Sequence, residues 1–144
     1  MVLFSCYLRK GLVYIPTVGK VEGGPYRQIE PVVVLPVSHA VDLQHAFEET
    51  MMRGNPTILN LARADHGDPV ILKYAGVKTY SAFVRAAQYW MIEEDQGVYQ
   101  IAGQRKLAPR GWVDDPKQTE TFSAHAKPDE VVRRMIAILQ EAVS

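Results

Sequence analysis

Cysteine is almost missing from this sequence of 144 residues, because Cys6 is its only thiol. A single cysteine can form neither an internal disulfide nor a cysteine-based metal cage. A chain of this length buries roughly 68–70% of the surface that it exposes when unfolded, so we expect a self-sufficient core. Cys6 lies in an apolar run, and we interpret it as a small buried side chain rather than a nucleophile.

A surplus of either charge is also missing. The 16 Lys and Arg residues cancel the 16 Asp and Glu residues. A generally basic nucleic-acid-binding protein is therefore disfavoured, because contacts with the phosphate backbone need a cationic surplus. A local basic strip remains at Arg105, Lys106 and Arg110. We interpret this strip as an exposed loop that has the option of touching phosphate.

Long apolar runs are missing as well, since none approaches the ~18 residues of a membrane span. The first ten residues are apolar but lack the basic region that opens a secretion signal. Apolar residues make up 47% of the chain and charged residues 22%, which is the balance of a soluble globular protein. We therefore expect one domain spanning residues 1–144, located in the cytoplasm and without a membrane partner.

The first third of the chain has the composition of β-strands. The β-rich runs are 2–9, 12–18 and 26–37, separated by turn signals at Lys10-Gly11 and Gly23-Gly24-Pro25. The apolar stretch 32–35 predicts a strand that is covered on both faces and lies in the centre of a sheet. Later runs at 89–94 and 98–103 predict a hairpin around residues 95–97. Segment 70–74 is expected to add a short strand, and segments 112–113 and 119–122 are expected to add one or two more, separated by a turn at 114–117.

Three segments have helical periodicity. Ser38 is a plausible N-cap for a helix that Gly54 ends, and a shorter helix opens at residue 79. Pro128 suits the first position of a C-terminal helix with one apolar stripe, formed by Val132, Met135, Ile136, Leu139 and Val143. The sequence therefore predicts a single α+β domain, in which about three helices pack on a mainly antiparallel sheet.

Motifs that carry catalysis are missing. The glycines do not follow a P-loop order, no GxSxG elbow occurs, and no histidine pair has zinc-binding spacing. We therefore predict no enzyme activity, no catalytic residue, no metal and no cofactor. One alternative is a small hydrolase or nucleotide-linked enzyme that uses the loop Asp65-His66-Gly67-Asp68, a pattern able to bind a cation or exchange protons. Another is a small-ligand-binding regulatory module, which an apolar cavity between sheet and helices would support.

Acidic and aromatic residues gather in the later part of the chain. Two acidic groups occupy turn-like segments that flank an aromatic-rich block, and turns expose side chains. Trp and Tyr are favoured anchors of protein interfaces, and strand alternation places Tyr89 and Trp90 on opposite faces. The sequence thus predicts an acidic partner-binding surface with one tryptophan as its anchor, drawn from Glu93, Glu94, Asp95, Asp114, Asp115, Trp90 and Trp112.

Several segments together resemble the small immunity proteins of contact-dependent growth inhibition and related polymorphic toxin systems. They are residues 4–7, 53–56, 80–83, 89–93, 97–101, 111–116 and the helix at 128–144. The resemblance implies a cytoplasmic, non-enzymatic protein that binds and blocks a cognate toxin domain, often a nuclease. It implies no contact map, so the expected interface rests on the acidic and aromatic residues above.

Overall fold

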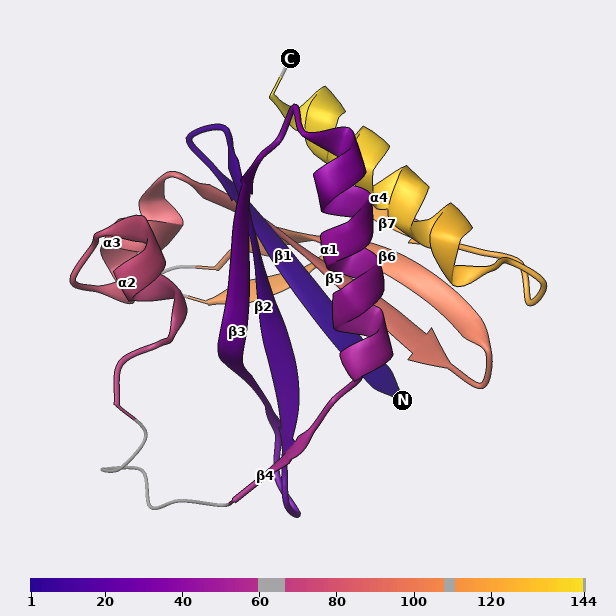
Figure 1. Cartoon of the computed structure of the whole chain (residues 1–144), viewed down its shortest axis with the longest axis horizontal. Coiled ribbons are helices and arrows are strands. Elements are labelled where there is room, and N and C mark those ends of the chain that lie inside the picture. The colour runs from indigo at the N-terminus through magenta and orange to yellow at the C-terminus, as the bar shows by residue number, and fades with distance from the viewer. Residues whose placement is uncertain (60–66, 108–110, 144) are drawn as a thin grey trace.

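The computed structural model describes residues 1–59, 67–107 and 111–143 and has a curved sheet with helices on both faces (Figure 1). The predicted α+β class is confirmed. The strands are β1 (Val2–Arg9), β2 (Leu12–Val21), β3 (Tyr26–Pro36), β4 (Thr57–Ile58), β5 (Ala87–Asp95), β6 (Val98–Lys106) and β7 (Trp112–Thr121). The helices are α1 (Ala40–Arg53), α2 (Ile71–Ala75), α3 (Tyr80–Arg85) and α4 (Pro128–Ala142).

The strand order is β3-β2-β1-β5-β6-β7, with antiparallel neighbours, and β4 pairs in parallel with the end of β2. Two-residue turns close the β1–β2 and β5–β6 hairpins. Both turn residues have positive φ, 52° and 78° for Lys10 and Gly11, and 52° and 81° for Gln96 and Gly97. This geometry matches the twist of the flanking strands, and glycine adopts it without strain. The hairpin predicted around residues 95–97 is confirmed.

The predicted central position of the third strand is wrong, because β3 lies at one edge of the sheet. Its apolar stretch is nevertheless covered on both faces, as the sequence indicated. Val33 and Leu35 pack towards the core under α1 and α4, and Val32 and Val34 pack towards α2 and α3. An edge strand that helices cover on both faces has the same continuous apolar run as a central strand that is covered on both faces. The run therefore predicts the covering of the strand but not its position in the sheet.

Four other expectations need correction. Residues 71–75 form helix α2 rather than a strand, so the described part of the chain has four helices instead of about three. Helix α1 begins after His39, one residue later than predicted, without a side-chain cap. Residues 112–121 form one strand, in which residues 115–118 bulge out opposite Gly103 instead of forming a turn between two strands. On the C-terminal helix, Val143 is 49% exposed and lies outside the buried stripe.

The sheet opens between β1 and β2. These strands pair only from Tyr7↔Tyr14 to Arg9↔Leu12, and then diverge. The Asn55 side chain bridges the divergence: its Oδ1 accepts a hydrogen bond from the main-chain N–H of Leu3, and its Nδ2 donates to the carbonyls of Leu3 and Val18. Asn55 therefore replaces part of the missing ladder.

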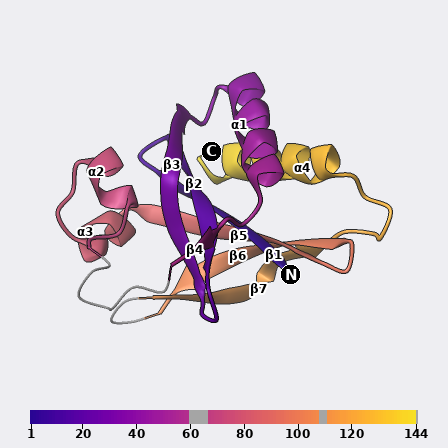
Figure 2. The same ribbon diagram turned by 60° about the horizontal axis from the view of Figure 1, so that its bottom comes forward.

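Two apolar clusters form the core, one on each face. On the first face, α1 and α4 lie side by side over Phe4, Cys6, Trp90 and Ile92 (Figure 2). The predicted α4 stripe is buried there from Val132 to Leu139. On the second face, α2 and α3 cover Tyr7, Tyr14 and Tyr89, and Phe83 of α3 meets Tyr7 edge-on. The second face holds most of the residues of the candidate site.

Candidate functional site

Strand alternation divides the predicted acidic residues between the two faces. Glu93 and Asp95 share the second face with Tyr89, whereas Glu94 shares the first face with Trp90. Asp114 on β7 pairs with Gln104, and the register also places it on the second face. We use the name acidic surface for Glu93, Asp95 and Asp114, which the fold brings to one face from two strands.

The acidic surface concentrates like charges. Partial burial raises the pKa of the Glu93 carboxyl, and the negative charges of Asp114 and Asp95 raise it further. Repulsion between neighbouring carboxylates destabilises the free protein. A cationic partner group would relieve it, so the arrangement suits contact with a basic surface.

The fold uses Asp115 differently from the other acids. Its carboxylate accepts hydrogen bonds from the Lys117 main-chain N–H and from Gln118 Nε2, at 3.0 and 2.9 Å. These bonds lower the pKa of Asp115 and shape the β7 bulge. The bulge fits only because residue 103 is glycine: a Cβ there would lie 2.6 Å from Gln118 Cβ. Asp115 therefore has an internal role and is not included in the acidic surface.

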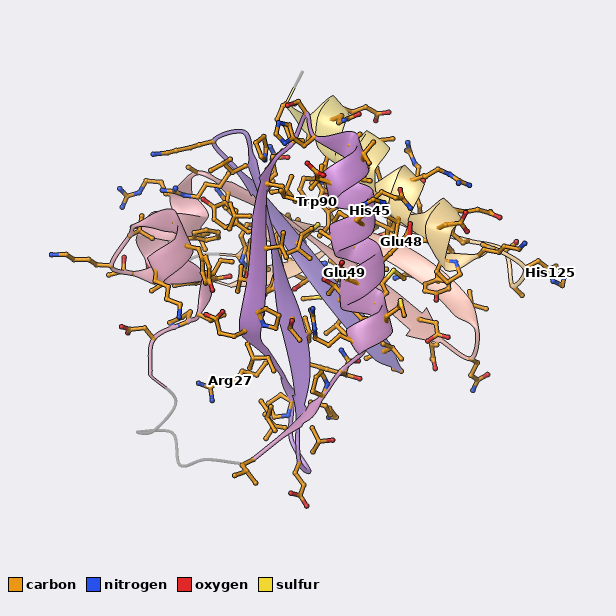
Figure 3. All side chains as sticks on the ribbon, viewed as in Figure 1. Arg27, His45, Glu48, Glu49, Trp90 and His125 are labelled. Atoms are coloured by element: carbon orange, nitrogen blue, oxygen red, sulfur yellow. The ribbon has the colours of Figure 1, made fainter. Side chains whose placement is uncertain are left out.

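The two tryptophans lie in different surroundings. Trp90 is only 3% exposed and packs in the core of the first face, and Figure 3 labels it beside α1. Trp112 is partly exposed on the second face, next to Tyr89, with ring centroids 5.3 Å apart. Of the two predicted anchors, Trp112 is the one that a partner of the folded protein can reach.

A partly buried network of hydroxyl and amide groups lies on the same face. Gln28 Nε2 lies 3.0–3.2 Å from the hydroxyls of Ser5, Tyr7 and Tyr89. The Tyr80 hydroxyl lies 3.0 Å from that of Tyr7 and accepts a 2.9 Å hydrogen bond from Trp112 Nε1. Burial is the main cause that raises the pKa of Tyr89 to about 12, so its hydroxyl stays neutral.

This network holds Trp112 and α3 against the sheet. Sequence reasoning missed it, because no local pattern links residue 28 to residues 5, 7 and 89. The polar residue Gln28 within a β-rich run was the only available signal.

The described residues give little support to catalytic chemistry. Cys6 is fully buried, and burial raises the pKa of its thiol well above the ordinary range. In the part of the chain that the structure describes, no three His, Cys, Asp or Glu side chains gather as metal ligands. Figure 3 shows His45 on α1 far from His125, which lies in the loop before α4. The alternative enzyme hypothesis rests on the loop at 65–68. Asp68 of this loop is exposed, and Asp65 and His66 lie outside the described residues.

A shallow groove of about 580 Å³ runs between α1 and α4, on the outer side of the helices. Its walls include Val41, which is 70% exposed, and Ile136, which is 7% exposed. The groove is not the apolar cavity between sheet and helices that a small-ligand-binding module would have. No helix of the described chain is long and apolar enough to cross a membrane.

Comparison with known proteins shows similarity of fold. No protein-family model matches the chain, and no curated sequence matches it. A structure of a protein of unknown function from Neisseria meningitidis aligns with a TM-score of 0.68 at 14% identity, covering 98% of this chain and 94% of that one. A chain of the CdiA-CT/CdiI toxin and immunity complex from Yersinia pseudotuberculosis aligns with a TM-score of 0.63 at 12% identity, covering 96% of both. The fold is therefore shared nearly end to end with chains of very different sequence.

Proposed function

We propose that this protein is an immunity protein: it binds a cognate toxin domain and blocks it without catalysis. The observation that carries this proposal is the near-complete structural match to a chain of a toxin and immunity complex. The segments that resemble immunity proteins in the sequence support the same role. Such a protein would act in the cytoplasm of the cell that it protects.

We further propose that the acidic surface contacts the toxin, with Trp112 as its anchor. A nuclease toxin attracts phosphate and therefore needs a basic active cleft. Three carboxylates on one face would be drawn to that cleft and would exclude the nucleic acid. Trp112 lies on the same face and is held by Tyr80, so little side-chain freedom is lost when it is covered.

Protection of growing cells tests the role itself. A toxin domain encoded next to the gene of this protein is expressed from an inducible promoter, with and without this chain. We expect growth arrest without the chain, normal growth with it, and a stable complex in size-exclusion chromatography. Arrest that continues although the chain is present and folded contradicts the immunity role.

A fold-disrupted variant provides the control. Leu139 is fully buried on α4, so Leu139→Asp should abolish folding and protection together. Protection by the folded chain alone shows that the effect comes from the protein and not from its messenger RNA.

A further inference from the structure

A second site lies where β5 and β6 separate. Their ladder ends at Trp90↔Gly103, although β5 begins at Ala87 and β6 continues to Lys106. A cleft of about 300 Å³ lies at this opening. The lining residues come from β5, β6 and β7 and are Ala87, Gln88, Tyr89, Trp90, Gln104, Arg105, Lys106, Trp112 and Gln118.

The charges that line this cleft are all positive among its described residues. Arg105 and Lys106 are both exposed, and no carboxylate of the described chain lies within salt-bridge distance of either. Lys106 Nζ donates to the main-chain carbonyl of Arg85 at 3.2 Å, which fixes its position beside the cleft. Arg105 lies near enough to Asp115 to lower the pKa of that carboxyl without forming an ion pair.

A third cation lies next to the cleft. Arg9 pairs with Ala87, and Ala87 lines the cleft. Arg9 is only 7% exposed, its guanidinium lies 5.5 Å from the Phe83 ring centroid, and its Nε has no hydrogen-bond partner among the residues that the structure describes. A buried cation that the described residues do not neutralise adds to the positive potential here.

We propose that the β5–β6 cleft binds a small phosphate-bearing anion. Arg105 and Lys106 supply the charge that attracts it, and Arg guanidinium groups match phosphate oxygens geometrically. The Gln88 side chain makes no hydrogen bond to another described residue, so its amide can donate to an anion, and Trp112 gives the cleft an aromatic wall. The cleft adjoins the acidic surface, because Trp112 borders both and Gln104 of the lining donates a 2.7 Å hydrogen bond to Asp114. The anion site rests on Arg105 and Lys106 and does not depend on the proposed function.

Tryptophan fluorescence offers a direct test. The chain has two tryptophans, Trp90 and Trp112, and both line the cleft. Inorganic phosphate is titrated into the isolated protein at an ionic strength of about 10 mM, held constant with sodium chloride, where screening is weak. We expect a saturable change in emission, and an at least tenfold weaker apparent affinity for Arg105→Gln/Lys106→Gln.

The matched control removes two cations elsewhere. Lys127 and Arg133 are exposed and belong to the start of α4, on the other face of the sheet. Lys127→Gln/Arg133→Gln should bind phosphate like the wild type. The proposal is overturned if emission does not saturate, or if both double variants lose affinity equally, because the effect is then one of net charge. Unchanged thermal unfolding of both variants shows that their folds are intact.

Discussion

Glu93 and Glu120 carry the same side chain on neighbouring parts of the sheet, yet their surroundings affect them in opposite ways. Burial and two acidic neighbours raise the pKa of Glu93. Two 2.8 Å hydrogen bonds from Arg134 lower the pKa of Glu120. The folded protein therefore binds a proton more tightly than the unfolded chain at Glu93, and less tightly at Glu120. Ionisation thus opposes folding at the first position and favours it at the second.

These opposite shifts predict opposite pH effects for two identical substitutions. Because a raised folded pKa makes stability fall as pH rises above the unfolded pKa, Glu93→Gln should raise the urea midpoint at pH 7. Glu120→Gln should lower the midpoint at pH 7, because the wild-type ion pair is lost only as pH falls through the folded pKa. Both differences should shrink towards pH 3. Urea unfolding of both variants and the wild type at several pH values checks these shifts in the midpoint. If both substitutions shift the midpoint in the same direction, the ionised Glu93 does not oppose folding.

Asn55 is the residue that holds β1 to β2 after their ladder ends. It satisfies three main-chain groups, on Leu3 and Val18. Asn55→Ala leaves these groups without their partner, so we expect a loss of about 1–3 kcal/mol in the free energy of unfolding. Gln44→Ala is the control, because the Gln44 side chain bonds Glu48 along a helix surface, where substitutions change stability by less than about 0.5 kcal/mol. Equal losses for the two variants, measured by urea unfolding, would show that Asn55 has no special role.

At the level of elements, the hairpin turns and the α4 stripe could be predicted from local signals, whereas the position of β3 and the type of element at 70–74 could not. Lys10-Gly11 and Gly97 mark turns through their own backbone preferences, and the α4 stripe follows from helical spacing alone. The apolar run of β3 comes from helices that cover the strand at the edge of the sheet. Nothing within residues 26–36 indicates that helices α1 and α2 would cover an edge strand there. Likewise, Val70 to Tyr74 have strand-like composition, but Ile71 and Leu72 bury their side chains from a short helix.

The packing of α4 gives a quantitative prediction. Ile136 is 7% exposed and lies in the cluster formed by α1, α4 and the first face of the sheet. Ile136→Ala should lower the free energy of unfolding by about 2–5 kcal/mol, the range for truncation of a large buried aliphatic side chain. Val41→Ala on α1 is the control, because Val41 is 70% exposed and should change stability by less than about 0.5 kcal/mol. An unchanged urea midpoint for Ile136→Ala would mean that the α4 stripe contributes little to the core.

Over the whole molecule, a net charge of zero conceals two separate charged regions. The acidic surface contains Glu93, Asp95 and Asp114, and the β5–β6 cleft carries Arg105 and Lys106. Composition alone indicated neutrality, and the sequence predicted a surface formed by some of five acids, with one of two tryptophans as its anchor. The fold retains three of those acids and Trp112, because alternation sends Glu94 and Trp90 to the first face and the bulge uses Asp115.

This charge separation predicts how the proposed toxin complex assembles. Glu93→Gln/Asp114→Asn removes two charges from the acidic surface while keeping side-chain shape and the ability of residue 114 to accept from Gln104. If this surface meets a basic cleft, association should slow about tenfold at low salt, and the rate should depend less on salt. Glu48→Gln/Glu49→Gln on α1 removes the same charge from the other face of the sheet, where Figure 3 labels both residues, and should leave the rate nearly unchanged.

Stopped-flow association at about 20 mM and 500 mM salt separates the possible causes. A loss of rate confined to Glu93→Gln/Asp114→Asn, and only at low salt, assigns the encounter to the acidic surface. Equal slowing by both double variants would reflect net charge alone and would remove this surface from the proposal. If Glu93→Gln/Asp114→Asn associates at the wild-type rate and still protects growth, the immunity role stands, and the toxin binds a surface other than the acidic surface. Rim charges act mainly on association, whereas Trp112→Ala should act mainly by accelerating dissociation, because a covered aromatic anchor is lost.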